Sequence, residues 1–464
     1  MNLISAQLSS RLPDRVKLST ALPWVMVTCG MVLMLIWPLI HTIALRILLV
    51  FMGGMIGAWY LIRERFNLYQ KPALPLLFIF LLFIWVGIHY LFFARNPGLE
   101  LGQIKGIWLR VFLAFLLGIS TGLFARNNQR AQLLLWAGFS SITVMSFLDY
   151  AWVSITRSDW SIPYPCKLGI YDNKISIVFY GIALFALCCG LISYELLRNS
   201  KSNGRNILIP TFLIGFTFLA FVLVGTKNGI ALGLILISIL FAIYFIKASK
   251  SFKTNLVAAT LIIIIGSMSY LHLRISPEWK NFFPTVAAGV QIDRYPNWQD
   301  VITRGDPVLE DGSVASESAY LRSAFATKGL RLLLENPFGY GVVNESFKYL
   351  MIESSPGGLG AYPINVTHSG WLDFSLCLGI PGILIVWTAM ASAFYFSFVQ
   401  KTRWAYCGRW ILAGSFLVWI FAEVGHTHFV ETLFYLIALI TAGNLPIVAD
   451  SRNQAANSVN TARS

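Results

Sequence analysis

Long apolar stretches, each close to the length that spans a bilayer, dominate the chain. A membrane-spanning helix needs about 20 consecutive, mostly apolar residues. Twelve stretches approach that length, at residues 21–40, 41–62, 73–93, 104–124, 131–153, 175–197, 206–224, 229–246, 256–273, 370–396, 408–424 and 428–447. The pattern predicts an all-α integral membrane protein with about 12 transmembrane helices.

One polar interval of about 95 residues interrupts the apolar pattern and divides the chain. Residues 1–273 hold nine predicted membrane helices joined by short loops. Residues 274–369 form a single large loop, and residues 370–447 hold three further helices. Residues 448–464 form a polar tail. We therefore expect any chemistry in water to be carried by the large loop and the helix ends beside it.

Composition excludes an ordinary soluble domain. Of the 464 residues, 56% are hydrophobic and only 12% are charged, whereas soluble proteins carry about 25% charged residues. The first apolar stretch is long and a second follows at once, so no cleavable signal peptide is expected.

The basic residues predict the orientation. With the N-terminus in the cytoplasm, 19 of the 35 Lys and Arg residues fall in the N-terminal segment, in alternate short connections and in the tail. This is the positive-inside asymmetry. It places both termini in the cytoplasm and the large loop on the periplasmic side. The net charge of +14 then lies beside anionic lipid headgroups, so no nucleic-acid partner is needed to explain it.

The large loop is expected to be partly helical. Trp279, Phe282 and Phe283 lie among charged residues, as is typical of a segment in the headgroup zone. Farther on, Ser316 can cap a helix that runs to Glu335, where Asn336-Pro337 ends it. This helix has a stripe of Leu321, Phe325, Lys328 and Leu332, with Arg322 at its edge.

Cysteines and histidines predict neither a disulfide framework nor a metal site. Of six cysteines, Cys166 alone falls in a predicted outer loop, and no spacing typical of zinc ligands occurs. His426 and His428 lie on a predicted outer turn without a third nearby ligand. We therefore expect no metal and no cofactor.

Two segments, Asn336-Pro-Phe-Gly-Tyr-Gly341 and Thr367-His-Ser-Gly-Trp-Leu372, resemble the characteristic region of the O-antigen ligase/polymerase superfamily of bacterial envelope glycosyltransferases. The resemblance covers the twelve-helix layout and, at motif level, roughly residues 315–385. Weaker similarity extends to Lys167–Asn173 and Gly225–Gly229.

The resemblance assigns roles to individual residues. An arginine precedes the Asn-Pro-x-Gly-x-Gly element in the family, and Arg322 stands there. The family histidine before the tenth span corresponds to His368. Ser369 follows it where the family usually has Asn, and Thr226-Lys227 stand where the family has a Ser-Arg pair. Lys227 keeps the positive charge but lacks the two-pronged donor geometry that suits phosphate.

The resemblance also implies a reaction. Family ligases transfer a glycan from undecaprenyl diphosphate to a sugar hydroxyl of the lipid A core oligosaccharide, on the periplasmic face and without an obligatory metal. Such a transfer needs a base, which a histidine can provide near neutral pH. It also needs cations that stabilise the diphosphate leaving group. His368 is the predicted base, and Arg322, Lys227 and Arg110 are the predicted substrate-binding cations.

Arg110 enters this set because it lies inside an apolar stretch, as Arg46 also does. Arginines within membrane spans are functional candidates by default. The alternative for both is that the side chain extends to the headgroups or pairs with a carboxylate.

The other predicted site residues have structural alternatives as well. His368 can be an interfacial anchor, Arg322 can pair with Glu317 or Asp311, and Lys227 can serve only to set topology. At the level of the whole protein, the alternatives are a polysaccharide polymerase, a protein O-oligosaccharyltransferase, and a polysaccharide transporter or flippase. No internal repeat with matching broken helices supports a transporter.

Overall fold

The computed structural model describes residues 12–64, 68–158, 174–197, 204–246, 281–343, 345–354, 365–421 and 427–446, with a few single residues between them. In these segments the secondary structure is helical, and Val308 and Val314 form an isolated bridge in a turn. This agrees with the predicted all-α class.

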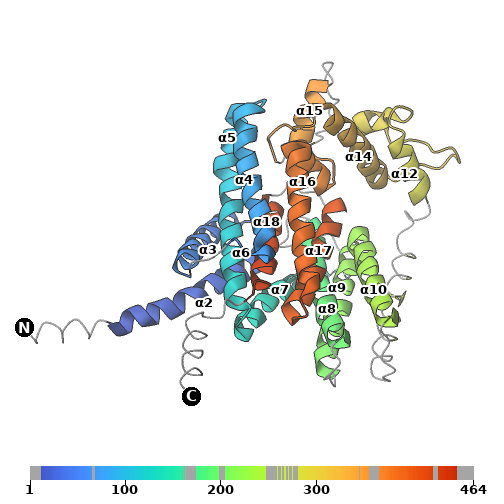
Figure 1. Ribbon diagram of the computed structural model, residues 1–464. Helices are drawn as coiled ribbons and strands as arrows, with labels where there is room; N and C mark the ends of the chain where they lie inside the picture. The colour runs from blue at the N-terminus through green and yellow to red at the C-terminus, as the bar shows by residue number, and fades with distance from the viewer. Residues whose placement is uncertain are drawn as a thin grey trace, which may run out of the picture.

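Most helices lie side by side in one bundle, and a smaller group gathers at one end of it (Figure 1). The bundle helices are α2 (Leu12–Ile36), α3 (Ile43–Arg63), η1 (Lys71–Ala73), α4 (Leu74–Phe92), α5 (Pro97–Gln103), η2 (Ile104–Trp108), α6 (Leu109–Ala125), α7 (Gln129–Arg157), α8 (Lys174–Leu197), α9 (Gly204–Val224), α10 (Lys227–Ile246), α16 (Gly370–Val399), α17 (Arg403–Phe421) and α18 (Thr427–Gly443).

Within the described residues, eight helices are long and apolar enough to cross a membrane, and three shorter apolar helices span Ala21–Ile36, Lys227–Ile243 and Thr427–Gly443. They overlap the predicted stretches except for 256–273, which falls largely outside the described residues. These helices indicate a multi-pass membrane protein. The total of twelve spans stays a prediction.

Burial separates lipid-facing helices from central ones. Along α3 only 22% of the most apolar window is buried, and Ile43 and Phe51 are more than half exposed. Along α8 the corresponding share is 94%. Because large apolar side chains at the periphery of a water-soluble bundle would be costly, the exposed face of α3 suits contact with lipid tails.

The group of helices at the end of the bundle comes from the predicted large loop. It comprises α12 (Phe282–Val290), η5 (Pro296–Gln299), α13 (Val301–Arg304), α14 (Glu317–Glu335) and α15 (Ser346–Ser354). Tyr320, Phe325 and Leu332 of α14 pack into a second hydrophobic core with Trp298 and Phe347. This core reaches the bundle at Leu372 and Leu376 of α16.

Helix α14 begins and ends where the sequence predicts, with Ser316 before its first residue and Asn336 after its last. Leu321, Phe325 and Leu332 are buried. On the exposed side, Arg331 donates two hydrogen bonds to Asp293, at 2.9 and 2.7 Å. These bonds lower the pKa of the Asp293 carboxyl. The pair is therefore intact at neutral pH and is lost only as the pH falls through that lowered value.

Helix α16 is broken at Gly379, which has φ +69° and ψ −175°. We call Gly370–Leu378 its first segment. Pro381 has no N–H, so the Cys377 carbonyl has no helical donor. The Asn336-Pro-Phe-Gly-Tyr-Gly341 element lies against the break and supplies the missing partner, because Gly341 N–H donates to Cys377 O at 2.8 Å.

Three further hydrogen bonds close the break. Tyr340 N–H donates to Leu376 O, and Ile380 N–H donates to Pro337 O, both at 2.8 Å. Trp85 Nε1–H donates to Leu378 O at 2.9 Å. Since an unpaired backbone group in hydrocarbon costs several kcal/mol, a broken membrane helix needs such partners. The element that carries the family resemblance is thus the hydrogen-bonding partner of the broken helix.

Candidate functional site

His368 lies at the corner where the loop enters α16. Its φ is +61°, an unusual value for a residue with a Cβ. Buried Asp373 holds this corner from the first turns of the helix. It accepts hydrogen bonds from the N–H of Thr367, at 2.7 Å, and from the Thr367 hydroxyl, at 2.8 Å. Strained backbone persists where its surroundings fix it, and it often marks functional sites.

The His368 ring stacks on Phe325 of α14, with ring centroids 5.9 Å apart and an angle of 21° between the planes. Phe325 is buried, whereas His368 is half-buried. Arg322 precedes Phe325 by three residues and therefore lies beside it on the helix surface. Arg322 is half-buried, as predicted for a residue at the edge of the packed stripe.

Lys227 is the first residue of α10 and is placed by a tight turn after α9. Gly225, with φ +68°, bonds through its N–H to Val222 O, and Thr226 N–H bonds to Phe221 O, both at 3.0 Å. This pair of bonds is the Schellman arrangement that ends a helix at glycine. The Thr226 carbonyl then accepts from Ile230 N–H and starts α10. The Gly225–Gly229 segment thereby fixes where Lys227 stands.

Lys227 and Arg322 lie close enough for their positive charges to act on each other. Lys227 also stands at the N-terminus of α10, the positive end of the helix dipole. Three predicted site residues, Lys227, Arg322 and His368, are thus brought together from three parts of the chain. We call these three residues and Phe325 the loop-side cluster.

Arg110 belongs to a second cluster inside the bundle. Its Nε lies 3.0 Å from Oε1 of Glu431, which is 3% exposed. Trp37 donates from Nε1 to the other oxygen of Glu431 at 3.2 Å. Arg46 donates to the Trp37 carbonyl at 3.1 Å, and its charge also acts on Glu431. Arg110 therefore pairs with a carboxylate, which is the structural alternative to phosphate binding that the sequence left open for this residue.

Glu431 is a residue that the sequence analysis did not single out. An acidic residue inside the apolar stretch 428–447 is the signal that would have found it. Its neighbours include Tyr180, whose hydroxyl lies 2.9 Å from Thr432 Oγ1, and His428, whose ring stacks on Tyr180. His428 is buried in the first turn of α18, and His426 lies outside the described residues. We call Arg46, Arg110 and Glu431 the bundle cluster.

A π-helical segment, η2, lies immediately before the helical turn that carries Arg110. Such segments shift the positions of all following side chains and often occur at functional sites. Within the continuous helix Pro97–Ala125, Arg110 lies beside Glu431 in the bundle interior.

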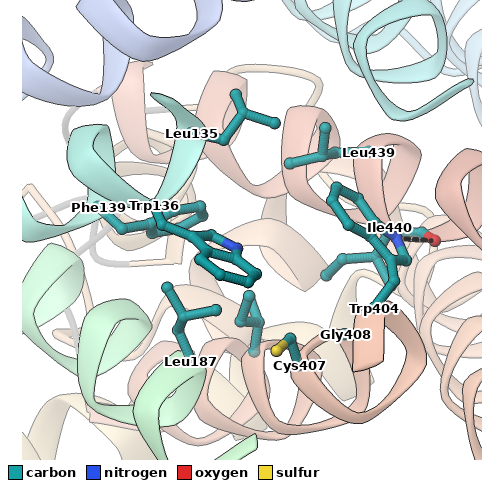
Figure 2. A pocket seen from close by; sticks show the side chains of 10 residues that line it. Leu135, Trp136, Phe139, Leu187, Trp404, Cys407, Gly408, Leu439 and Ile440 are labelled. Atoms are coloured by element: carbon teal, nitrogen blue, oxygen red, sulfur yellow. Dashed lines mark hydrogen bonds between the residues drawn. The ribbon is translucent and has the colours of Figure 1, made fainter. Parts of the chain in front are cut away.

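A crevice between α7, α8, α17 and α18 is too small and too apolar to be the reaction site (Figure 2). Its volume is about 20 Å³, comparable with a single water molecule. Trp136, Leu187 and Trp404 point into it, and Trp404 donates from Nε1 to Ile440 O at 3.3 Å. The crevice lies near the start of α17, at the end of the bundle that the charge pattern assigns to the cytoplasm.

The loop-side cluster combines an imidazole with two cationic side chains. An imidazole can accept a proton, and two cations can attract an anionic leaving group. Lys227 and the corner at His368 both lie at helix ends that the charge pattern assigns to the side of the large loop. The candidate site therefore lies at the boundary between the bundle and the loop helices.

The O-antigen ligase family model matches residues 212–387, whereas no curated protein matches the chain. The matched region includes Lys227, Arg322 and His368 together with the break in α16, and Arg110 lies outside it. Over residues 212–387, this chain is therefore similar to the O-antigen ligase family.

Proposed function

We propose that this protein is an O-antigen ligase that transfers a glycan from undecaprenyl diphosphate to a sugar hydroxyl of the lipid A core oligosaccharide. The observation that carries the proposal is the meeting of Lys227, Arg322 and His368 where α14 packs on the start of α16. The family match over the same residues supports it.

In the proposed reaction the acceptor hydroxyl oxygen forms a bond to the anomeric carbon of the donor glycan. The bond from that carbon to the diphosphate oxygen breaks, and its electron pair leaves with undecaprenyl diphosphate. His368 takes the hydroxyl proton. A positioned base of this kind contributes about 10²–10⁴-fold to rate. The stacking of His368 on Phe325 orients the imidazole for that transfer.

Arg322 and Lys227 stabilise the charge that develops on the leaving diphosphate. Two like charges held near each other repel, and an anion between them removes that repulsion. The N-terminus of α10 adds to the attraction, because helix N-termini favour phosphate groups. Arg110 is assigned a further contact with the donor from the bundle side, where Glu431 holds its guanidinium when no donor is bound.

The proposed setting is the bacterial inner membrane, with twelve spans, both termini in the cytoplasm and residues 274–369 in the periplasm. The positive-inside charge pattern supports it. A reporter fused after Glu310 is expected to be periplasmic, and one fused after Arg403 cytoplasmic. A cytoplasmic signal from the Glu310 fusion would place the loop-side cluster away from the periplasmic acceptor and overturn the assignment.

The deciding experiment supplies purified protein with undecaprenyl diphosphate-linked glycan and one acceptor at a time. We expect glycan on the lipid A core oligosaccharide, and we expect transfer to persist in EDTA because the family resemblance implies a metal-independent reaction. Lengthening of the lipid-linked glycan instead would identify a polymerase. Glycan on an acceptor protein would identify a protein O-oligosaccharyltransferase.

A further inference from the structure

A buried pair of ionisable residues, His89 and Glu100, lies behind the break in α16. His89 is in the last turn of α4 and Glu100 is in α5; their exposed fractions are 0% and 1%. Nδ1 of His89 lies 2.7 Å from Oε1 of Glu100. The proposed chemistry uses neither residue.

The hydrogen bonds of His89 determine how many protons the pair holds. Nε2 of His89 lies 3.0 Å from the carbonyl oxygen of Phe338. Because a carbonyl only accepts, Nε2 carries a hydrogen. The contact between Nδ1 and Glu100 Oε1 then contains one proton, whichever of the two atoms holds it. The pair is electrically neutral as a unit in either arrangement, which makes its complete burial tolerable.

Both members of the pair touch the element that closes the break. His89 donates to Phe338 O. The second carboxylate oxygen of Glu100 lies so close to Gly341 that a Cβ on Gly341 would collide with this oxygen. Within the described residues that oxygen, Oε2, has no hydrogen-bond donor. A buried carboxylate oxygen without a donor is destabilising. Fold stability alone therefore does not explain why a polar pair occupies this position.

The pair also joins the two helices that carry the proposed chemistry. Glu100 is on the continuous helix Pro97–Ala125, ten residues before Arg110. Pro337, Tyr340 and Gly341, in the same element as Phe338, hold the break at Gly379. The first segment of α16 runs from that break back to Gly370, two residues after His368. The hydrogen bonds of His89 and Glu100 thus connect the helix that carries Arg110 to the first segment of α16, which follows the corner at His368.

We propose that His89 and Glu100 are positioning residues that set the first segment of α16, and with it the His368 imidazole, relative to the donor-binding helix. The inference rests on the proposed function, because its effect is on the rate of glycan transfer. Hydrogen bonds are directional, so a hydrogen-bonded pair holds the neighbouring helices in one relative position. Apolar side chains of similar size pack well in several relative positions.

The test compares the double variant His89→Leu/Glu100→Leu with the single variant Glu100→Gln. Replacing a buried polar pair by apolar residues is often neutral or stabilising, so we expect the double variant to fold and to melt near the wild-type temperature. Its kcat should fall at least tenfold while its KM for the lipid-linked donor stays within about twofold. Glu100→Gln should keep kcat within about threefold, since its amide N–H can donate to Nδ1 of His89.

Amide hydrogen exchange supplies a readout that does not depend on the reaction. In the double variant, the N–H groups of Tyr340, Gly341 and Ile380, which bridge the break, should exchange faster than in the wild type and in Glu100→Gln. Asp293→Ala is the matched control, because it removes an exposed ion pair with Arg331 and neither residue takes part in the hydrogen bonds that close the break.

A wild-type kcat in the folded double variant overturns the proposal, whatever its amide exchange. Unchanged exchange at the three bridging amides also overturns it, because the pair would then not hold the break. If the double variant does not fold, His89→Phe/Glu100→Leu, which keeps the volume of the ring, replaces it with the same expected losses. Absence of transfer by the wild-type protein with every acceptor refutes the proposed function instead, and amide exchange still decides whether the pair holds the break.

Discussion

The first segment of α16 lies between two residues with positive φ, and only one of them is a glycine. At the break, Gly379 has φ +69° and no side chain. At the corner, His368 has φ +61° and keeps an imidazole. A residue with a Cβ costs about 1 kcal/mol or more in this conformation. The corner therefore retains a strain that glycine would remove.

The surroundings explain why the two positions differ. A Cβ on Gly379 would collide with the backbone of Pro337 and Phe338, so a side chain is excluded. The corner has room for a ring, which stacks on Phe325 and stays half-buried. Glycine at the break is needed because the backbone leaves no room for a side chain. Histidine at the corner is instead kept for its imidazole, which has room there. Strain combined with a reactive group is the pattern expected of a functional residue.

The largest effect is expected from His368→Gly. The glycine relieves the strained φ, so the melting temperature should stay near the wild-type value, while transfer should fall by about 10²–10⁴-fold because the base is gone. Transfer by purified protein and thermal unfolding in detergent measure the two quantities. His41→Gly is the matched control, since exposed His41 has φ +57° at a different turn. Near-wild-type transfer by His368→Gly would make His368 an interfacial anchor.

Gly379→Ala should have the opposite outcome and damage the fold. The methyl group adds backbone strain and a collision with the closing element, together about 2–4 kcal/mol. We expect less folded protein and a lower melting temperature, with transfer reduced in proportion to the folded fraction. Gly87→Ala is the control, because nothing lies within 4 Å of its added Cβ. Equal stability of both variants would show that the break is not closed as described.

Arg322→Ala tests the leaving-group contact beside the corner. Loss of a charge-assisted hydrogen bond in a water-poor site costs a few kcal/mol, on the order of a hundredfold in rate. Arg322→Lys should recover only part of the loss, because lysine has no planar pair of donors. Arg331→Ala, on the exposed side of the same helix, should transfer normally. Full activity of Arg322→Ala at normal protein levels would remove Arg322 from the site.

The sequence predicts the helices of this fold better than their interruptions. Apolar length alone locates most of the bundle, and the cap residues locate α14, because both signals are local. The break at Gly379 was missed, since residues 370–396 form an uninterrupted apolar stretch. Gly379 and Pro381 are the local signals for it. Which segment supplies the missing hydrogen bonds depends on tertiary packing, and no local pattern encodes that.

The same limit applies to the site. Family resemblance selects His368, Arg322 and Lys227, and the fold brings them together, although their catalytic and binding roles stay predictions. Glu431 and the pair His89–Glu100 were missed because single polar residues in apolar stretches carry no information about their partners. Glu431 lies more than 300 residues from Arg110, so only the folded chain shows that they meet.

The smallest effect is expected from Lys227→Arg, which restores the arginine that the family has at this position. A guanidinium can donate two parallel hydrogen bonds to a phosphate, whereas an ammonium acts as a point charge. Lys227 is placed by the turn at Gly225 and lies close enough to Arg322 for their charges to act on each other. We therefore expect kcat/KM for the lipid-linked donor to rise a few-fold, with the melting temperature unchanged. Lys328→Arg on α14 is the control and should leave kcat/KM unchanged. If Lys227→Arg and Lys227→Ala both transfer like the wild type, Lys227 does not contact the diphosphate and serves only the topology of α10.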